Sequence, residues 1–396
     1  MKSNEELEGI VNFWDLSTKL HVKLNPKFKE ILLSKFLEVN ESGNEAGKSI
    51  GSTGPTIRNY LKENSNMRTD FIIKIANLTN INLSEIQKNI IWIGDDQSHG
   101  IINPKLPFSF NCGEGARFLA AICNDGWISD GVYYSNSDEE LRSSVKKDVL
   151  SVFGGDENTV HEWIKEKDQY LSFPSVIRDV LILITGFKGV KSENNPQIPA
   201  FILKNQELMR AWIGQTIADE GYVKDNSTGH REIIWTRSFK EDLEKYKLYE
   251  DEIKMLNSIG IDYTTYVVGR YNTERGIRKI RKSIRISGRE NLLKFRQLIK
   301  IPCRRKDETF TEMLSKFVRY KEPLAVRDAV KRIYGVRGYV TSSLLRDEMN
   351  YKTVNVAIKW LKLYESQGML RCIKRSYYLP GGYRRPAKYV FNKQIV

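Results

Sequence analysis

Two stretches of this chain end in acidic residues at a place where helix electrostatics oppose them. Residues 117–128 read RFLAAICNDGWI and residues 211–223 read AWIGQTIADEGYV, each apolar for most of its length, then acidic, then glycine. The apolar runs and the glycines predict helices that end near Gly126 and Gly221. The carbonyls exposed at a helix C-terminus repel carboxylates, at a cost of roughly 0.3–1 kcal/mol. The acids at the C-termini of both predicted helices therefore need a reason other than helix stability.

The two stretches align with each other. Placing Gly126 opposite Gly221 puts Asp125 opposite Glu220 and Trp127 opposite Tyr222, at a separation of 95 residues. The residues that follow each copy also correspond, because strands and helices are predicted in a similar order. A repeat of this kind suggests a pseudo-twofold pair of units, each containing helices and strands. The first copy is followed by strands at 127–135, 159–166 and 169–173 and helices at 138–154 and 175–186, and the second by strands at 222–225, 231–238, 262–271 and 277–287 and helices at 241–260 and 290–299.

These residues resemble a known family. FLAAICNDG (118–126) and IGQTIADEG (213–221) are similar to the two motif copies of LAGLIDADG homing endonucleases, and the resemblance covers about residues 108–300. It implies an α+β fold, a pseudo-twofold duplicated αββαββα domain in which the motif helices pack side by side and the two sheets form a saddle over DNA. The motif's second and third positions, small in the family, are Leu119 and Ala120 in the first copy and Gly214 and Gln215 in the second.

By this resemblance, Asp125 and Glu220 occupy the catalytic, metal-binding positions. A hard divalent cation prefers oxygen ligands, and one or two carboxylates with phosphate and water suit Mg²⁺. Such an ion can activate water and stabilise the leaving oxygen of a displacement at phosphorus. The expected activity is Mg²⁺-dependent, site-specific cleavage of double-stranded DNA. A basic residue that assists cleavage has no evident position in the sequence.

Residues 1–91 predict an all-α helix-turn-helix domain. In EAGKSIGSTGPTIRNYLKEN (45–64), one helix ends near Gly51, and a second begins with Ser52 or Thr53 as its cap and Pro55 in its first turn. Ala46 would permit a close helix crossing, with Ile57 and Leu61 facing inward. The outward positions, which would contact the major groove, include Arg58, Asn59 and Lys62. A generic helical hairpin is the alternative.

The expected domain order continues with a polar linker at 92–110 and the double-motif domain at 111–300, with its repeats at 111–190 and 200–300. Residues 301–396 predict a winged-helix domain of three helices and two strands around a Pro-Gly-Gly turn. Arg384 and Arg385 follow that turn, where a wing would meet phosphate, although solvated arginines on a structural hairpin would have the same sequence.

Charge favours a polyanionic partner. The net charge of the chain is +14. Residues 301–396 hold 21 Lys and Arg against 8 Asp and Glu, which leaves about +1 for the rest of the chain. In IRKIRKSIRI (277–286), alternation places Lys279, Arg281 and Arg285 on one strand face and isoleucines on the other, which suits a ribbon laid against DNA or a solvated sheet face.

Other features of the sequence exclude several classes. The four cysteines and four histidines are scattered, so neither a disulfide framework nor a zinc site is indicated. No apolar run approaches the roughly 20 residues that span a bilayer, and a cytoplasmic monomer is expected. Two alternatives to the nuclease stay open: a DNA-binding transcription regulator that retains the LAGLIDADG scaffold without cutting, and a maturase-like protein that binds RNA.

Overall fold

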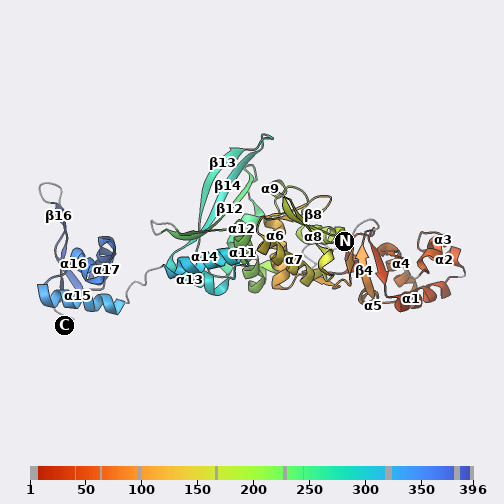
Figure 1. The fold of residues 1–396 in the computed structure, drawn as a ribbon, viewed down its shortest axis with the longest axis horizontal. Coiled ribbons are helices and arrows are strands. Elements are labelled where there is room, and N and C mark those ends of the chain that lie inside the picture. Colours follow the sequence, from red (N-terminus) through yellow and green to blue (C-terminus); the bar gives the residue numbers. More distant parts are fainter. Residues whose placement is uncertain are drawn as a thin grey trace. The chain divides into compact units, whose positions relative to one another are not determined.

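The computed structural model describes residues 8–40, 42–62, 65–95, 100–165, 168–225, 230–243, 245–316, 323–378 and 384–392. The chain forms two compact units, Met1–Ser315 and Lys316–Val396, whose helices and strands are drawn in Figure 1. Mixed helices and small antiparallel sheets make it an α+β protein. Within the described ranges, no helix combines the length and the apolar character that a bilayer crossing requires.

The N-terminal part of the first unit is not all-α. It contains a four-stranded sheet in the order β3-β2-β4-β5 beside its helices. The strands escape prediction because they are short and come from distant parts of the sequence, so no continuous alternation marks them. The helices are α1 (Pro26–Glu38), α2 (Gly43–Ser49), α3 (Gly54–Tyr60), α4 (Thr69–Thr79) and α5 (Leu83–Lys88), and the strands are β2 (His21–Leu24), β3 (Met67–Arg68), β4 (Ile90–Gly94) and β5 (Ile101–Ile102).

The predicted pair of short helices is present as α2 and α3. Thr53 caps α3, and its hydroxyl accepts a hydrogen bond from the Thr56 amide at 3.4 Å. The close crossing depends on Gly47 rather than on Ala46 alone, because a Cβ on Gly47 would lie 2.5 Å from the Thr53 carbonyl carbon. Leu61 is exposed, contrary to the prediction.

The inward position of α3 belongs to Tyr60, which is buried with Ile57. Residues three apart share a helix face, and the helix ends at Tyr60, so Leu61 caps its C-terminus and points away from the core.

Residues 92–110 do not form a free linker. They contain the end of β4, all of β5, and β6 (Phe108–Ser109), which pairs with β1 (Ile10–Val11). Phe108 and Phe110 are buried, and both rings contact Phe153. The glycines and prolines of this segment therefore mark turns between short strands rather than a flexible connection.

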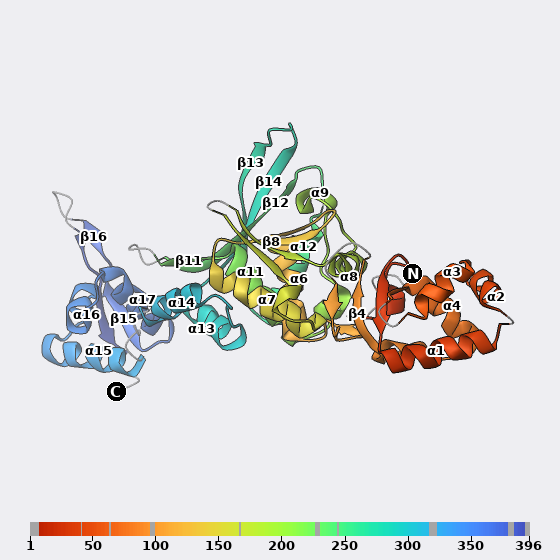
Figure 2. The same ribbon diagram turned by 45° about the vertical axis from the view of Figure 1, so that its right-hand side comes forward.

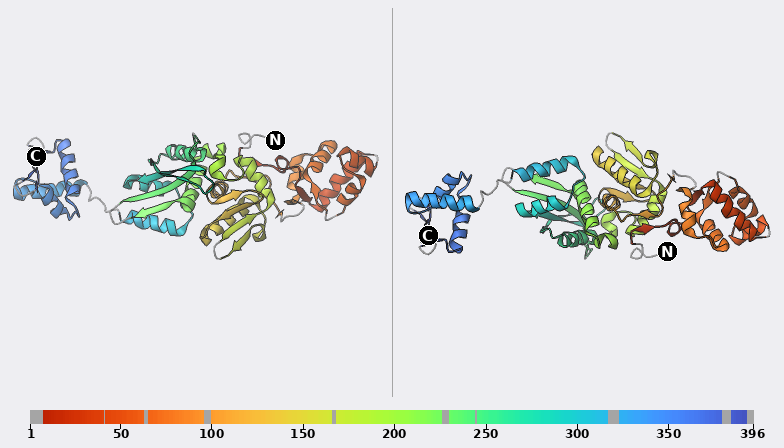
Figure 3. Two further views of the ribbon diagram at one scale, coloured as in Figure 1. Left: turned by 90° about the horizontal axis from the view of Figure 1, so that it is seen from above. Right: turned by 90° about the horizontal axis from the view of Figure 1, so that it is seen from below.

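The centre of the first unit contains two runs of elements in the same order: helix, two strands, helix, two strands, helix. The first sheet has the strand order β7-β8-β10-β9, and the second has the order β11-β12-β14-β13. In Figure 3 the two sheets lie on either side of helices α6 and α11. The first run is α6 (Gly113–Asn124), β7 (Gly126–Ile128), β8 (Val132–Ser135), α7 (Glu139–Phe153), β9 (His161–Ile164), β10 (Gln169–Phe173) and α8 (Ser175–Thr185), and the second is α11 (Gln206–Glu220), β11 (Tyr222–Asp225), β12 (Arg231–Lys240), α12 (Lys247–Ser258), β13 (Thr264–Asn272), β14 (Arg278–Ser287) and α13 (Arg289–Leu298).

Three further helices lie outside these runs. They are α9 (Lys191–Asn194), α10 (Ala200–Leu203) and α14 (Arg304–Ser315). Helix α14 belongs to the first unit, so the second unit begins at Lys316 rather than at residue 301. The Phe310 ring of α14 packs edge-on against Phe295 of α13, at a centroid distance of 5.8 Å. That buried contact explains why the basic segment after residue 301 begins inside the central unit.

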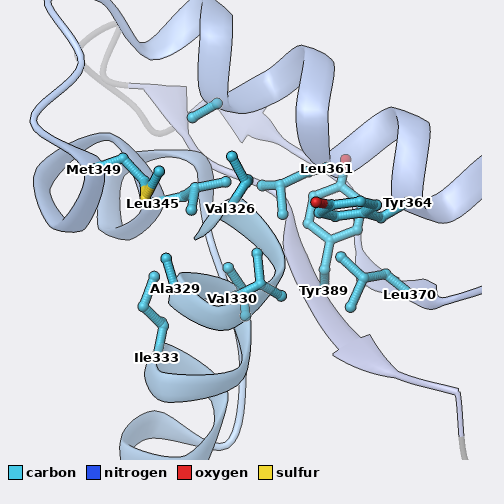
Figure 4. Close-up of a cluster of buried hydrophobic side chains, with 12 residues drawn as sticks. Val326, Ala329, Val330, Ile333, Leu345, Met349, Leu361, Tyr364, Leu370 and Tyr389 are labelled. Carbon is cyan, nitrogen blue, oxygen red and sulfur yellow. The ribbon is translucent and has the colours of Figure 1, made fainter. Parts of the chain in front are cut away.

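The second unit consists of three helices followed by a β-hairpin, as predicted for residues after 323. Figure 4 shows its core, where Val326, Val330, Leu345, Leu361 and Tyr389 meet. The Pro-Gly-Gly turn lies outside the described residues. The elements are α15 (Pro323–Arg337), α16 (Ser342–Met349), α17 (Val354–Ser366), β15 (Leu370–Lys374), β16 (Tyr377–Tyr378), β17 (Arg384–Arg385) and β18 (Lys388–Phe391), with β15 paired to β18 and β16 to β17.

Candidate active site

Helices α6 and α11 pack side by side and bring the two acidic motif ends into one region (Figure 2). A glycine comes directly after the acid at the end of each helix, and the chain changes direction there. A Cβ on Gly126 would lie 2.7 Å from Ile122 Cα, and a Cβ on Gly221 would lie 2.6 Å from the Ile217 carbonyl oxygen. Any larger residue would clash with the preceding turn, so the fold itself requires both motif glycines.

Asp125 follows the last residue of α6 and is half-buried. Its Oδ2 accepts a hydrogen bond from Asn136 Nδ2 at 2.8 Å. Burial raises the pKa of Asp125 above its usual value, and Lys191, Asn136, Arg237 and Lys306 offset that rise only in part. The carboxylate thus lies in a partly desolvated position with three cations close enough to favour its charged form.

Glu220 is the last residue of α11, and one third of its side chain is exposed. Its Oε1 accepts a hydrogen bond from Arg237 Nη1 at 3.3 Å. Burial raises the pKa of Glu220; Arg237 lowers it, and Asp125 raises it by repulsion. Glu220 thus lies beside a guanidinium, and Asp125 is among the charges that act on its carboxyl group.

Arg237 on β12 is held by a buried network. Its Nε donates to Glu252 Oε2 at 3.2 Å, its Nη2 donates to Glu252 Oε1, and the same Nη2 donates to Asn124 Oδ1 at 2.7 Å. Glu252 on α12 is fully buried and also accepts from Trp235 Nε1 at 3.0 Å. Burial alone would lower the pKa of Arg237, but Glu252 and Glu220 raise it above its usual range. The guanidinium is therefore fixed between a core carboxylate and a site carboxylate.

A third carboxylate, Asp219, joins the two halves of the site. It accepts hydrogen bonds from Asn124 Nδ2 (2.9 Å), Tyr134 OH (2.7 Å) and Gln215 Nε2 (2.9 Å). Burial, with repulsion from Asp125, raises the pKa of Asp219 to about 7. Asn124 and Asp219 occupy the same place in the two motif copies, so this bond crosses the helix interface. Gln215, the large residue of the second copy, is buried there and holds Asp219.

Two lysines provide the positive charge that the helix ends require. Lys191 of α9 donates to the last carbonyls of α6, and Lys306 of α14 donates to the last carbonyls of α11. Cations at a helix C-terminus are stabilised by the same field that opposes the acids. Burial lowers the pKa of both lysines. The acceptors are Ile122 O (3.4 Å) and Asn124 O for Lys191, and Ile217 O (3.1 Å), Ala218 O (2.6 Å) and Asp219 O (3.2 Å) for Lys306.

A cavity of about 470 Å³ opens beside Asp125. Its lining is mainly polar and includes Asp125, Asn136, Asp219, Arg305 and Lys306. Three acids, Asp125, Asp138 and Asp219, and two cations line its wall, so the cavity suits a polar or charged ligand with its counter-ion rather than an apolar one.

Asp125 and Glu220 are the two predicted acids that could hold a cation. Within the described residues, Asp125 Oδ1 and Glu220 Oε2 accept no hydrogen bond, so each carboxylate keeps one oxygen available. Those residues contain no group of three or more His, Cys, Asp or Glu side chains placed to hold a metal. A divalent ion here would have two protein carboxylates and complete its shell with water and phosphate, which suits Mg²⁺.

The predicted basic face of β14 is present. Lys279, Arg281 and Arg285 lie on the outward face, whereas Ile280, Ile284 and Ile286 are buried. The guanidinium carbons of Arg281 and Arg285 lie 5.3 Å and 4.7 Å from the ring centres of Tyr271 and Tyr266. Lys279 Nζ donates to Ser192 Oγ of α9 at 2.7 Å, which ties the strand to the helix that carries Lys191.

The other predicted contacts lie on separate surfaces. Arg58, Asn59 and Lys62 are exposed on and just after α3. Arg385 is exposed on β17, and the backbone of Arg384 pairs with Tyr378; the Arg384 side chain lies outside the described part.

Sequence reasoning missed most of the residues that surround the acids. Lys191, Lys306 and Arg237 come from elements far from the motifs, and no local pattern marks them. Asn124 and Asp219 could have been found, because the alignment of the two motif copies places them opposite each other.

Comparison with known proteins adds no family. The chain matches no protein-family model, and no curated protein sequence matches it. The function is therefore inferred from the geometry and the charges of this site.

Proposed function

We propose that this protein is a site-specific, Mg²⁺-dependent double-strand DNA endonuclease of the LAGLIDADG homing type. The observation that supports the proposal most is the matched pair Asp125 and Glu220. They end two adjacent helices, interact electrostatically, and each keeps one carboxylate oxygen free of hydrogen bonds among the described residues. The two runs of elements with the same strand order agree with a pseudo-twofold saddle.

Asp125 and Glu220 would hold the divalent ion, which, when bound, supplies an activated water and stabilises the leaving oxygen. Asn136 orients the Asp125 carboxylate, and Arg237 orients that of Glu220. Orientation of this kind matters because a displacement of about 1 Å can reduce a rate about 100-fold.

Lys191 and Lys306 would stabilise the scissile phosphates through their charge, while their described hydrogen bonds go to the helix-end carbonyls. Their ammonium groups are anchored on the helix ends, and both lie close enough to Asp125 to lower its pKa. Fixed cations beside a reacting phosphate stabilise the charge that develops in the transition state. Each motif copy has one such lysine, which suits a site that cuts two strands.

Duplex binding would use the basic face of β14 together with the terminal modules. Arg281 and Arg285 face outward, and Arg58 and Asn59 are exposed on a short helix that follows a turn. The three-helix unit with its hairpin would act as a winged helix and place Arg385 at phosphate. Linked modules raise the overall affinity through effective concentration. Because both motif copies are on one chain, the protein would act as a monomer.

One observation favours the second candidate, a DNA-binding regulator that does not cut. Arg237, Lys191 and Lys306 already compensate the acids, so the site can be stable without a metal ion. In a regulator, duplex binding would be equally strong with and without Mg²⁺.

The test is selection from a library of duplex targets that includes the gene's own genomic neighbourhood. The purified full chain with Mg²⁺ should release cut duplexes, and Asp125→Asn or Glu220→Gln should abolish cutting while binding is retained. Asp130→Asn is the matched control, because Asp130 is an exposed acid on the same repeat, and the described hydrogen bonds of its carboxylate come from its neighbours Ser129 and Gly131. Metal-independent duplex binding without cleavage, unchanged in Asp125→Asn, would identify the regulator instead.

A further inference from the structure

The outward faces of the two central sheets differ in chemistry although their strands have the same order. On the first sheet, four rings cross all four strands; they are Trp127 on β7, Tyr133 on β8, Tyr170 on β10 and Trp163 on β9, and we call them the aromatic stripe. Trp127 and Trp163 are 37% and 48% exposed. Large apolar side chains that remain in water across a whole sheet indicate a binding surface.

The rings of the aromatic stripe contact each other continuously. Trp127 stacks on Tyr133 with centroids 4.7 Å apart and an angle of 20° between the rings, and Trp163 stacks on Tyr170 at 6.2 Å and 19°. Tyr170 also meets Tyr133 at 5.7 Å and 80°. The core side chains of these strands lie on the opposite face, where Tyr134 and Leu171 are fully buried. The stripe is therefore additional to the hydrophobic core.

The strand registers identify the matching positions on the second sheet. Trp127 pairs with Tyr133 on the first sheet, and the matching pair on the second sheet is Tyr222 with Ile234. Likewise, the pair Tyr170 and Trp163 on the first sheet matches the pair Ser283 and Tyr266 on the second. The second sheet thus has serine and isoleucine where the first has two tyrosines.

Basic side chains lie on the outward face of the second sheet, where the aromatic stripe has no counterpart of four rings. Arg285 lies at the register position that Ser172 occupies on the first sheet, and its guanidinium covers Tyr266 at 4.7 Å. The outward positions of the first sheet's strands are aromatic, serine or histidine, and Lys165, which follows β9, places its Nζ 5.9 Å from the Trp163 ring centre.

We infer that the aromatic stripe binds unpaired bases of single-stranded DNA. The affinity of proteins for duplex DNA comes largely from Lys and Arg that neutralise its phosphates, and the first sheet's strands place none of these outward. Base faces are hidden within a duplex, whereas an unpaired strand exposes them to stacking on aromatic rings. A basic second sheet for duplex and an aromatic first sheet for an opened strand would let one protein hold both forms.

The test measures binding of fluorescein-labelled dT12 to the full chain by fluorescence anisotropy. Trp127→Ala and Trp163→Ala should each raise the Kd about 5- to 150-fold, the range expected for loss of one base stack. Trp163→Phe should restore most of the affinity, because a phenyl ring still stacks. Tyr266→Ala is the matched control on the second sheet and should change the Kd less than twofold. Thermal unfolding of every variant verifies that the sheet is intact.

Salt dependence provides a second readout. With one lysine beside the stripe, the Kd for dT12 should rise with salt with a log–log slope of about 0.7, much shallower than for a duplex held by several cations. No binding of dT12, or Ala variants that bind it like the wild-type protein, would overturn the inference. Tighter binding of rU12 than of dT12 by tenfold, with the same dependence on Trp127 and Trp163, would overturn the assignment to DNA. Cleavage of duplex targets is measured separately, so either proposal can fail without the other.

Discussion

Substitution of Glu252 by Gln tests whether the core of the second repeat positions the candidate site. Glu252 is fully buried and accepts three hydrogen bonds, one from Trp235 and two from Arg237. Glu252→Gln preserves the shape of the side chain but removes its charge. Arg237 then becomes a buried cation whose remaining acidic partner among the described residues is Glu220, at 3.3 Å.

The expected loss follows from the burial of the pair. Removal of one partner from a buried ion pair destabilises a protein by about 3–5 kcal/mol. Glu220 recovers at most about 1 kcal/mol, because one third of its side chain is exposed and water screens the interaction. Glu252→Gln should therefore lower the free energy of unfolding of the first unit by about 2–4 kcal/mol. Cleavage should also fall, since Glu220 would be drawn toward Arg237 and away from the metal.

Urea unfolding of the full chain, followed by circular dichroism and tryptophan fluorescence, measures the change. Glu250→Gln on the same helix is the matched control, because Glu250 is only half-buried, and it should change the free energy of unfolding by less than about 0.5 kcal/mol. The double variant Arg237→Met/Glu252→Gln should regain most of the loss, because an apolar replacement leaves no unpaired charge. A loss below about 1 kcal/mol, or a double variant that loses the sum of both single changes, would refute this account of the network.

Asp219→Asn should flatten the dependence of stability on pH. The pKa of Asp219 in the folded protein is about 7, so its contribution to stability is complete below the unfolded pKa near 3.8 and is lost as the pH rises through 7. The free energy of unfolding should therefore differ more between pH 4.5 and pH 7.5 for the wild-type protein than for the variant. Equal differences would contradict the raised pKa. Gly214→Ala should destabilise the first unit by about 1–3 kcal/mol, because its Cβ would lie 2.3 Å from the Lys300 carbonyl oxygen. Gly43→Ala, whose Cβ would meet nothing within 4 Å, is the control for that thermal-unfolding comparison.

The sequence predicted the elements that carry strong periodicity. Helices α8 and α13 and strand β10 lie within a residue or so of their predicted limits, because their apolar positions repeat at the helix or strand period. Helix α12 begins at Lys247 rather than near residue 241. Its predicted first turn reads EDLEKY, a strong helix-forming composition, yet residues 241 and 242 form a turn after β12 and Tyr246 caps the helix. Tertiary context overrode local propensity there.

The candidate site was predictable only where it repeats. The two acids could be found because the motif occurs twice, and the glycine after each acid confirmed the alignment. The cations could not, because Lys191 and Lys306 reach the helix ends from α9 and α14, two short or polar helices whose contacts depend on the whole fold. A lysine in a polar segment has the same sequence appearance whether it lies in solvent or caps a helix.

The positions of those lysines change the reason that the acids are tolerated. A metal ion is not required to offset the helix ends, because each end already has an ammonium group on its carbonyls. The described hydrogen bonds of the two lysines go to backbone carbonyls. Their charges therefore make the potential at the helix ends less negative, and they do not occupy the free oxygens of Asp125 and Glu220. Such a site does not need a metal ion to offset the helix ends, and one oxygen of each acid accepts no described hydrogen bond, which leaves two ligands for the proposed Mg²⁺. Metal binding should consequently depend on the arrival of a phosphate rather than on folding, which is the order that a nuclease needs if it is to cut only after its target is bound.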